Sequence, residues 1–192
     1  MSIIRVPVNV RSLTLNINGT RTASVWTESF FNGVFNITRD IWLPAQIRFE
    51  VASFTPNVEA ELLNPTSTSR VNGSDQPYLC RLFQATTGVS LLLVNEATSR
   101  DPAASGVGGS SVAAFRTCLL AHNSNQRTVG VYLAHEFGHL LGLHDIYTGI
   151  GDNLMFGALS TGENRLNREQ RRLALRTARL LTQPTNSPTP QP

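Results

Sequence analysis

The fold is decided by one stretch of sequence, AHEFGHLLGLHD at residues 134–145. His135 and His139 are four residues apart in it, and the apolar pattern over residues 128–143 predicts a helix. Four residues turn an α-helix by about 400°, so the two imidazoles lie about 40° apart and about 6 Å apart along one face. Two imidazoles in that relation can reach one Zn²⁺ ion at about 2.0–2.1 Å. The stretch therefore predicts a metal-binding helix.

Other side chains in the stretch suit the same metal. Glu136 is one step round the helix from His135 and can reach a metal-bound water without being a ligand itself. Hydrolytic zinc usually has three protein ligands and one open position, so a third ligand is required. Gly142 allows a positive φ, which ends the helix and turns the chain back. Asp145 would then face the metal with a carboxylate oxygen, and His144 is the competing ligand.

Residues 135–145 resemble the metzincin zinc-peptidase signature, HExxHxxGxx followed by His or Asp. Met155, in the run Asn-Leu-Met, is similar to the methionine of the turn that lies beneath the metal in that family. Residues 143–149 are similar to the LxDxYxG run of the snapalysin-like bacterial subgroup, whose third ligand is Asp. Residues 166–170, LNREQ, are similar to the start of the last helix in matrixins.

The resemblance implies a zinc metalloendopeptidase, of EC 3.4.24 type. Its metal ligands would be His135, His139 and Asp145, because Asp145 rather than His144 stands at the third-ligand position of the signature. Glu136 would be the general base. Tyr147, two residues beyond the third ligand, would help to stabilise the tetrahedral oxyanion.

The rest of the chain alternates between strand-like and helix-like patterns. The expected strands are residues 3–17, 47–51, 78–83, 89–94 and 112–120, the expected helices are 23–41, 128–143 and 167–181, and the expected loops are 55–77, 100–111 and 146–165. A change of parity at Arg11-Ser12 suggests a bulge or two short strands. Asn167 and Gln170 have the spacing of a capping box at the start of the last helix.

This order predicts an α+β domain, an α/β sandwich of metzincin type. We expect a mixed twisted sheet with a long N-terminal helix, an active-site helix and a C-terminal helix. A length of 192 residues fits one domain. We place a single catalytic domain at residues 1–182 and a disordered tail, rich in Pro, Thr and Ser, at 183–192.

Composition and charge exclude several classes of protein. All 16 basic residues are Arg, and six of them lie in residues 163–181 with two Glu, so the other parts of the chain carry about −1 of the net +3 charge. A nucleic-acid binder would show a basic face supported by a motif, so we expect no nucleic-acid partner. No apolar run is long enough to span a membrane. Cys80 and Cys118 could form one disulfide or remain two buried thiols.

The expected function is hydrolysis of peptide bonds by a zinc-activated water. A protein or peptide substrate would lie extended along an edge strand from residues 107–120, and the enzyme is expected to be a monomer. The alternative is a non-catalytic, metal-stabilised binding module on the same fold. The chain shows no export signal and no lysine, which leads us to expect a protein that is secreted or delivered to another cell. A mature secreted protease whose signal was removed is the competing explanation.

Overall fold

The structure is a computed structural model, and it describes residues 2–17, 19–63, 70–97, 108–148, 152–157 and 165–185. The strands are β1 (Ile4–Ile17), β2 (Thr20–Thr22), β3 (Ile47–Glu61), β4 (Arg70–Val71), β5 (Val89–Val94), β6 (Glu96–Ala97), β7 (Gly109–Val112) and β8 (Thr117–Ala121). The helices are α1 (Glu28–Trp42), α2 (Asp75–Leu82), α3 (Gln126–Leu140) and α4 (Arg168–Leu181), with short 3₁₀ turns at Leu43–Ala45 and Ala113–Phe115.

The main sheet is mixed. Its strands run in the order β2-β1-β5-β8-β7, and β3 pairs with β1. β3, β1, β5 and β8 are parallel to one another, whereas β7 is antiparallel to β8 and forms the edge of the sheet in the described part of the chain. β4 and β6 form a separate two-stranded sheet.

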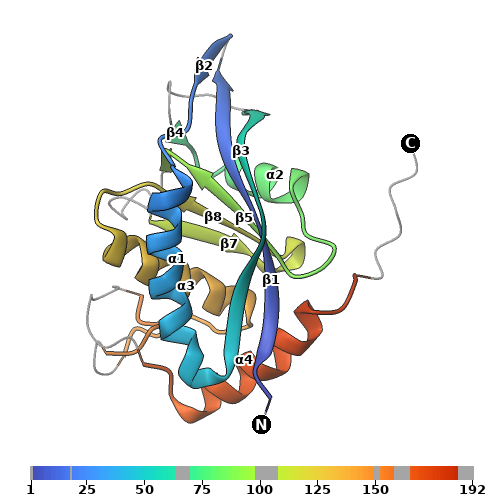
Figure 1. The fold of residues 1–192 in the computed structure, drawn as a ribbon, viewed down its shortest axis with the longest axis vertical. Coiled ribbons are helices and arrows are strands. Elements are labelled where there is room, and N and C mark those ends of the chain that lie inside the picture. Colours follow the sequence, from blue (N-terminus) through green and yellow to red (C-terminus); the bar gives the residue numbers. More distant parts are fainter. Residues whose placement is uncertain are drawn as a thin grey trace.

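Helices cover both faces of the main sheet. Figure 1 shows α1, α3 and α4 beside the main sheet. One core cluster packs these helices against side chains such as Val8 and Leu91. The second cluster packs α2 against the opposite face, with Leu79 next to residues such as Leu92 and Leu119. The strands β5 and β8 are buried on both sides, as parallel strands between two helical layers are expected to be. The predicted α+β sandwich with a mixed sheet is confirmed.

α1 and α3 pack unusually closely, because a glycine lies at their contact. A Cβ atom on Gly130 would lie 2.9 Å from the carbonyl oxygen of Val34 and 2.8 Å from Cβ of Ile37. Thr38 Oγ1 donates to the Gly130 carbonyl at 3.0 Å and so joins the two helices. This contact fixes the position of α3, the helix that carries the His pair.

The pairing of β1 with β3 shifts register between Arg11 and Leu13, where the change of parity suggested a bulge. β1 is one continuous strand, and both register shifts against β3 place the extra residue on β3. The first half of β1 buries Val6, Val8 and Val10 in one cluster, and the second half buries Leu13 and Leu15 in the other. Ser12 and Thr14 are buried as well, so the apolar parity changes because the apolar side chains move from one face of the strand to the other.

Two sequence predictions were wrong. Residues 78–83 belong largely to a helix, α2, rather than a strand. Its buried side chains, Asp75, Gln76, Leu79 and Cys80, have helical spacing, but two of them are polar, so hydropathy did not reveal the pattern. The predicted loop at 55–77 is also wrong in its first part, because β3 extends from the expected 47–51 to Glu61.

The three predicted helices and the strands β1 and β5 agree with prediction apart from their bounds, whereas the short strands β2, β4 and β6 were not predicted. Parts of the predicted loops 100–111 and 146–165 lie outside the described residues. The strand expected at 112–120 is divided into β7, a 3₁₀ turn and β8. α4 begins with the predicted capping box of Asn167 and Gln170. Of the predicted tail, residues 186–192 lie outside the described residues, and the Thr185 amide donates to the Thr86 carbonyl at 2.8 Å. None of the described helices is long and apolar enough to cross a membrane.

Candidate metal centre

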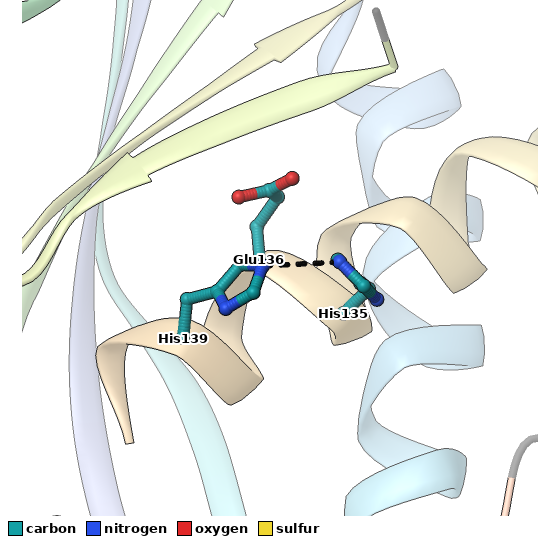
Figure 2. Close-up of side chains that lie close together, drawn as sticks. All are labelled: His135, Glu136 and His139. Carbon is teal, nitrogen blue, oxygen red and sulfur yellow. Dashed lines mark hydrogen bonds between the residues drawn. The ribbon is translucent and has the colours of Figure 1, made fainter. Parts of the chain in front are cut away.

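α3 places the two predicted imidazoles side by side. Asn125 caps the helix, since its side chain accepts from the Thr128 amide. His135 and His139 project from one face, with their Nε2 atoms 3.1 Å apart (Figure 2). His135 is buried and His139 is half-buried. The helical geometry predicted from the spacing is therefore present.

The chain after α3 turns back toward the His pair. Gly142 has φ of 82°, the Leu143 amide donates to the Gly138 carbonyl, and the Gly142 amide donates to the His139 carbonyl. This pair of bonds is a Schellman motif, in which a glycine takes the left-handed conformation. The turn brings Asp145 Oδ1 to 3.2 Å from His135 Nε2 and 3.6 Å from His139 Nε2. His144, by contrast, is exposed.

The protonation of the two imidazoles follows from their backbone partners. His135 Nδ1 lies 2.8 Å from the Leu154 carbonyl and His139 Nδ1 lies 2.9 Å from the Leu143 carbonyl. A carbonyl only accepts, so in the neutral rings both protons sit on Nδ1 and both Nε2 atoms carry lone pairs. Burial lowers the pKa of His135, which favours the neutral ring.

Three lone-pair atoms thus point at one small volume. Asp145 Oδ1 is buried and has no hydrogen-bond partner among the described residues. The three atoms are 3.1, 3.2 and 3.6 Å apart. Ligands at about 2.0–2.1 Å from a tetrahedral zinc ion would be about 3.3 Å apart. His135, His139 and Asp145 therefore fit a divalent metal in both donor type and spacing.

Glu136 lies beside this group and points away from it. Its carboxylate extends from α3 toward β7 (Figure 2), although its ligand atoms and those of the two His lie within 4.8 Å of one another. Desolvation by burial raises the pKa of Glu136 to about 7, against the opposing effects of His139 and a hydrogen bond with Ser111. A carboxylate with that pKa can both accept and return a proton near neutral pH.

The edge strand β7 forms the wall above the site. A pocket of about 340 Å³ lies between β7, α2 and α3, and its lining includes Glu136, His139, Gln76 and residues 109–113. Residues 108–112 lie within the segment predicted to supply a substrate-binding edge strand. Gln76 and Ser111 were not among the predicted site residues. No local signal marks either one, because only the order of the strands brings them to α3.

The predicted Met155 lies under α3. It is fully buried, and its sulfur packs directly against Gly138, one residue before His139. The preceding Leu154 carbonyl is the acceptor for His135 Nδ1. The turn thus both supports the helix from below and orients one imidazole.

Tyr147 lies at the rim rather than inside the site. Its side chain is 77% exposed, and its hydroxyl donates to Asp145 Oδ2 at 3.4 Å. The neighbouring Asp145 carboxylate raises the pKa of Tyr147. The structure therefore places Tyr147 next to the third predicted ligand.

His122 lies away from the site, whereas burial raises the pKa of the Cys118 thiol, which lies near enough to Glu136 for that carboxylate to add to the effect. His122 packs between Trp26 and Phe30, with ring centroids 5.2 and 4.8 Å away. Cys80 and Cys118 are both free, buried thiols, so they do not form the disulfide that the sequence left open.

Comparison with known proteins supports the fold. No protein-family model and no curated protein matches the sequence. Among solved structures, archaemetzincin from Methanopyrus kandleri aligns with a TM-score of 0.62 at 12% identity, covering 91% of this chain and 96% of that one. Metalloproteinase-II from Bacteroides fragilis aligns with a TM-score of 0.53 at 14% identity, covering 92% of this chain and 54% of that one, so the match spans about half of its length. At these identities the likeness shows the fold alone, and that fold is zinc-metallopeptidase-like.

Proposed function

We propose that the protein is a zinc-dependent endopeptidase of the metzincin type, with Asp as third ligand as in the snapalysin-like subgroup. The observation that carries the proposal is the convergence of His135 Nε2, His139 Nε2 and Asp145 Oδ1 at 3.1, 3.2 and 3.6 Å. With both rings neutral and protonated on Nδ1, each of these atoms offers a lone pair that a bound metal ion would accept. Two nitrogens and one oxygen in a tetrahedral arrangement are a typical zinc donor set.

The residues around the proposed metal have different roles in the reaction. Zinc held by the three ligands would acidify a water molecule and polarise the scissile carbonyl. Glu136, with a pKa of about 7, takes the proton from the attacking water and later delivers it to the leaving amine. Tyr147 is the proposed helper for the oxyanion, since it stands on the exposed side of Asp145.

The peptide substrate would bind in an extended conformation. β7 is the edge of the sheet in the described part of the chain, so its outer main-chain groups can pair with an added strand. Ser111 on β7 is hydrogen-bonded to Glu136, which means that a peptide beside this strand lies next to the base. This arrangement supports cleavage within an extended segment of a protein, as an endopeptidase requires.

A zymogram with an unstructured protein as substrate tests the proposal. We expect a band of hydrolysis that disappears with a chelator and returns when zinc is added. Stoichiometric zinc binding with no hydrolysis of any unstructured protein would instead support the non-catalytic binding module. Hydrolysis that persists in the fully chelated protein would contradict the proposal.

A further inference from the structure

The carbonyl that orients His135 lies in the turn at residues 153–155, and a residue of α4 contacts this turn. Leu154, whose carbonyl lies 2.8 Å from His135 Nδ1, stands between Asn153 and Met155. The Asn153 side chain bridges this turn, because its Oδ1 accepts from the Met155 amide at 2.9 Å. Backbone bonds also hold the turn, since the Leu154 amide donates to the Arg165 carbonyl at 3.0 Å and the Phe156 amide donates to the Asn153 carbonyl at 3.0 Å. The Asn153 side chain is the side-chain contribution to the position of the Leu154 carbonyl.

Asn153 is in turn paired with Gln170 on the first turn of α4. Asn153 Nδ2 donates to Gln170 Oε1 at 2.8 Å, and Gln170 Nε2 donates to Asn153 Oδ1 at 3.1 Å. Two complementary amides joined by two bonds fix both the separation and the orientation of the groups. This pair links the beginning of α4 to the turn beneath α3.

Neither amide can rotate without losing a backbone partner. Asn153 Oδ1 is needed by the Met155 amide, and Gln170 Oε1 accepts from the Asn167 amide at 2.9 Å as part of the capping box. Because oxygen and nitrogen cannot be exchanged in either side chain, only an amide at both positions completes the set of bonds. A helix cap alone would not require this, since Glu serves equally well at the third position of a capping box.

We propose that Gln170 is a positioning residue for the metal ligand His135, acting through Asn153 and the Leu154 carbonyl. The inference rests on the proposed function, since it concerns the metal that the His pair would bind. Gln170 has two separable tasks: its Oε1 closes the cap of α4, and its Nε2 holds Asn153. A group bonded directly to a metal-binding imidazole, here the Leu154 carbonyl, typically contributes about 10–100-fold to metal affinity, and Gln170, acting through Asn153, contributes up to the lower end of that range.

The substitution Gln170→Glu separates the two tasks. Glu keeps the acceptor for the Asn167 amide, and a negative charge in the first turn of a helix is favourable. It loses the donor to Asn153 and places a carboxylate oxygen against Asn153 Oδ1 instead. Asn153→Asp makes the matching change from the other side, because it keeps the acceptor for Met155 and loses the donor to Gln170. Glu169→Gln, exposed on the same turn of α4, is the control.

The experiment measures the Kd for zinc by chelator competition and the Tm of the metal-free protein. For both Gln170→Glu and Asn153→Asp we expect the Kd to rise by up to about tenfold, the lower end of the effect of a direct contact to the ligand. The Tm of the metal-free Gln170→Glu protein should change by less than about 3 °C, since its cap is intact. Glu169→Gln should bind zinc as the wild type does.

Two results would overturn the inference. The first is wild-type zinc affinity in both variants. The second is a loss of affinity accompanied in both by an equal loss of metal-free stability, which would show a purely structural role. Failure of the proposed function would look different. In that case the wild type would bind no zinc, or the zinc that it binds would be retained by His135→Ala.

Discussion

Gly109 and Glu136 lie so close together that a Cβ atom on Gly109 would be 2.8 Å from Glu136 Cγ. The same Cβ atom would also lie 3.1 Å from the Leu119 carbonyl, which is backbone and cannot move aside. The glycine therefore leaves the space in which the Glu136 side chain reaches Ser111. The position of Glu136, the proposed base, therefore depends on the glycine at the start of β7.

We expect Gly109→Ala to displace Glu136 and lower kcat/KM at least about tenfold, since loss of a general base costs about 10²–10⁴-fold. Zinc content should be unchanged, because the three atoms nearest to the added Cβ belong to Glu136 and Leu119 and not to a proposed ligand. The measurement is kcat/KM on a quenched-fluorescence peptide, together with zinc content by atomic absorption.

Gly33→Ala is the matched control for that variant. The three atoms nearest to its Cβ atom all belong to the end of the Gln126 side chain, which can rotate away, and Ala favours a helix interior over Gly. We expect unchanged kcat/KM. Full activity in Gly109→Ala would show that Glu136 need not occupy its observed position.

A second prediction separates the two candidate third ligands. Asp145→Ala removes a proposed ligand atom. It should therefore weaken zinc binding more than the loss of a group bonded to a ligand does, which costs about 10–100-fold. His144→Ala should leave zinc affinity unchanged, because His144 is exposed and Asp145 occupies the third position. Isothermal titration of both variants decides the matter, and the reverse order would assign the ligand to His144.

A third prediction concerns pH and His122. Burial lowers the pKa of His122 below its usual 6.5, so the unfolded chain takes up the proton more readily than the folded one. The contribution of His122 to stability is therefore complete above about pH 6.5 and is lost as the pH falls through the lowered value. We expect His122→Phe to reduce the difference in urea midpoint between pH 7.5 and pH 5.5. An unchanged difference would mean that His122 takes no part in it.

A fourth prediction concerns the attachment of α4. The Arg116 guanidinium donates to the carbonyls of Leu180, Leu181 and Gln183 at 3.3, 3.3 and 2.7 Å. It thus adds a charged donor to the end of the helix, where the Leu180 and Leu181 carbonyls also accept from the amides of Gln183 and Gly88. Arg116→Ala should lower the free energy of unfolding by about 1.5–3 kcal/mol, the contribution of hydrogen bonds to a charged group.

The control for this variant is Arg176→Ala, on the exposed face of α4, which should change stability by less than about 0.5 kcal/mol. Urea unfolding monitored by circular dichroism measures both. Equal effects of the two substitutions would contradict a capping role for Arg116.

The parts of the site that lie close in sequence could be predicted. His135 and His139 share a face because helix geometry alone determines it, and Gly142 with Asp145 follows from the way helices end. The capping box at Asn167 and Gln170 is equally local. In each case the relevant distance spans a few residues, so no knowledge of the tertiary fold was needed.

The parts that depend on tertiary contacts could not be predicted. Ser111 and Gly109 reach Glu136 only because β7 is at the edge of the sheet above α3. The hydrogen bonds between Gln170 and Asn153 could not be predicted for the same reason, since the two residues are 17 positions apart in the sequence. α2 was missed because Asp75 and Gln76 are buried polar residues, which hydropathy assigns to the surface.

The most direct test of the account compares Glu136→Ala with the wild type after both have been loaded with zinc. Turnover of an unstructured protein and zinc content are measured on the same samples, with Glu169→Ala as an exposed control. We predict one zinc per chain in all three proteins and a loss of at least about 10²-fold in the turnover of Glu136→Ala alone. Turnover at the wild-type rate in zinc-loaded Glu136→Ala would contradict the central claim.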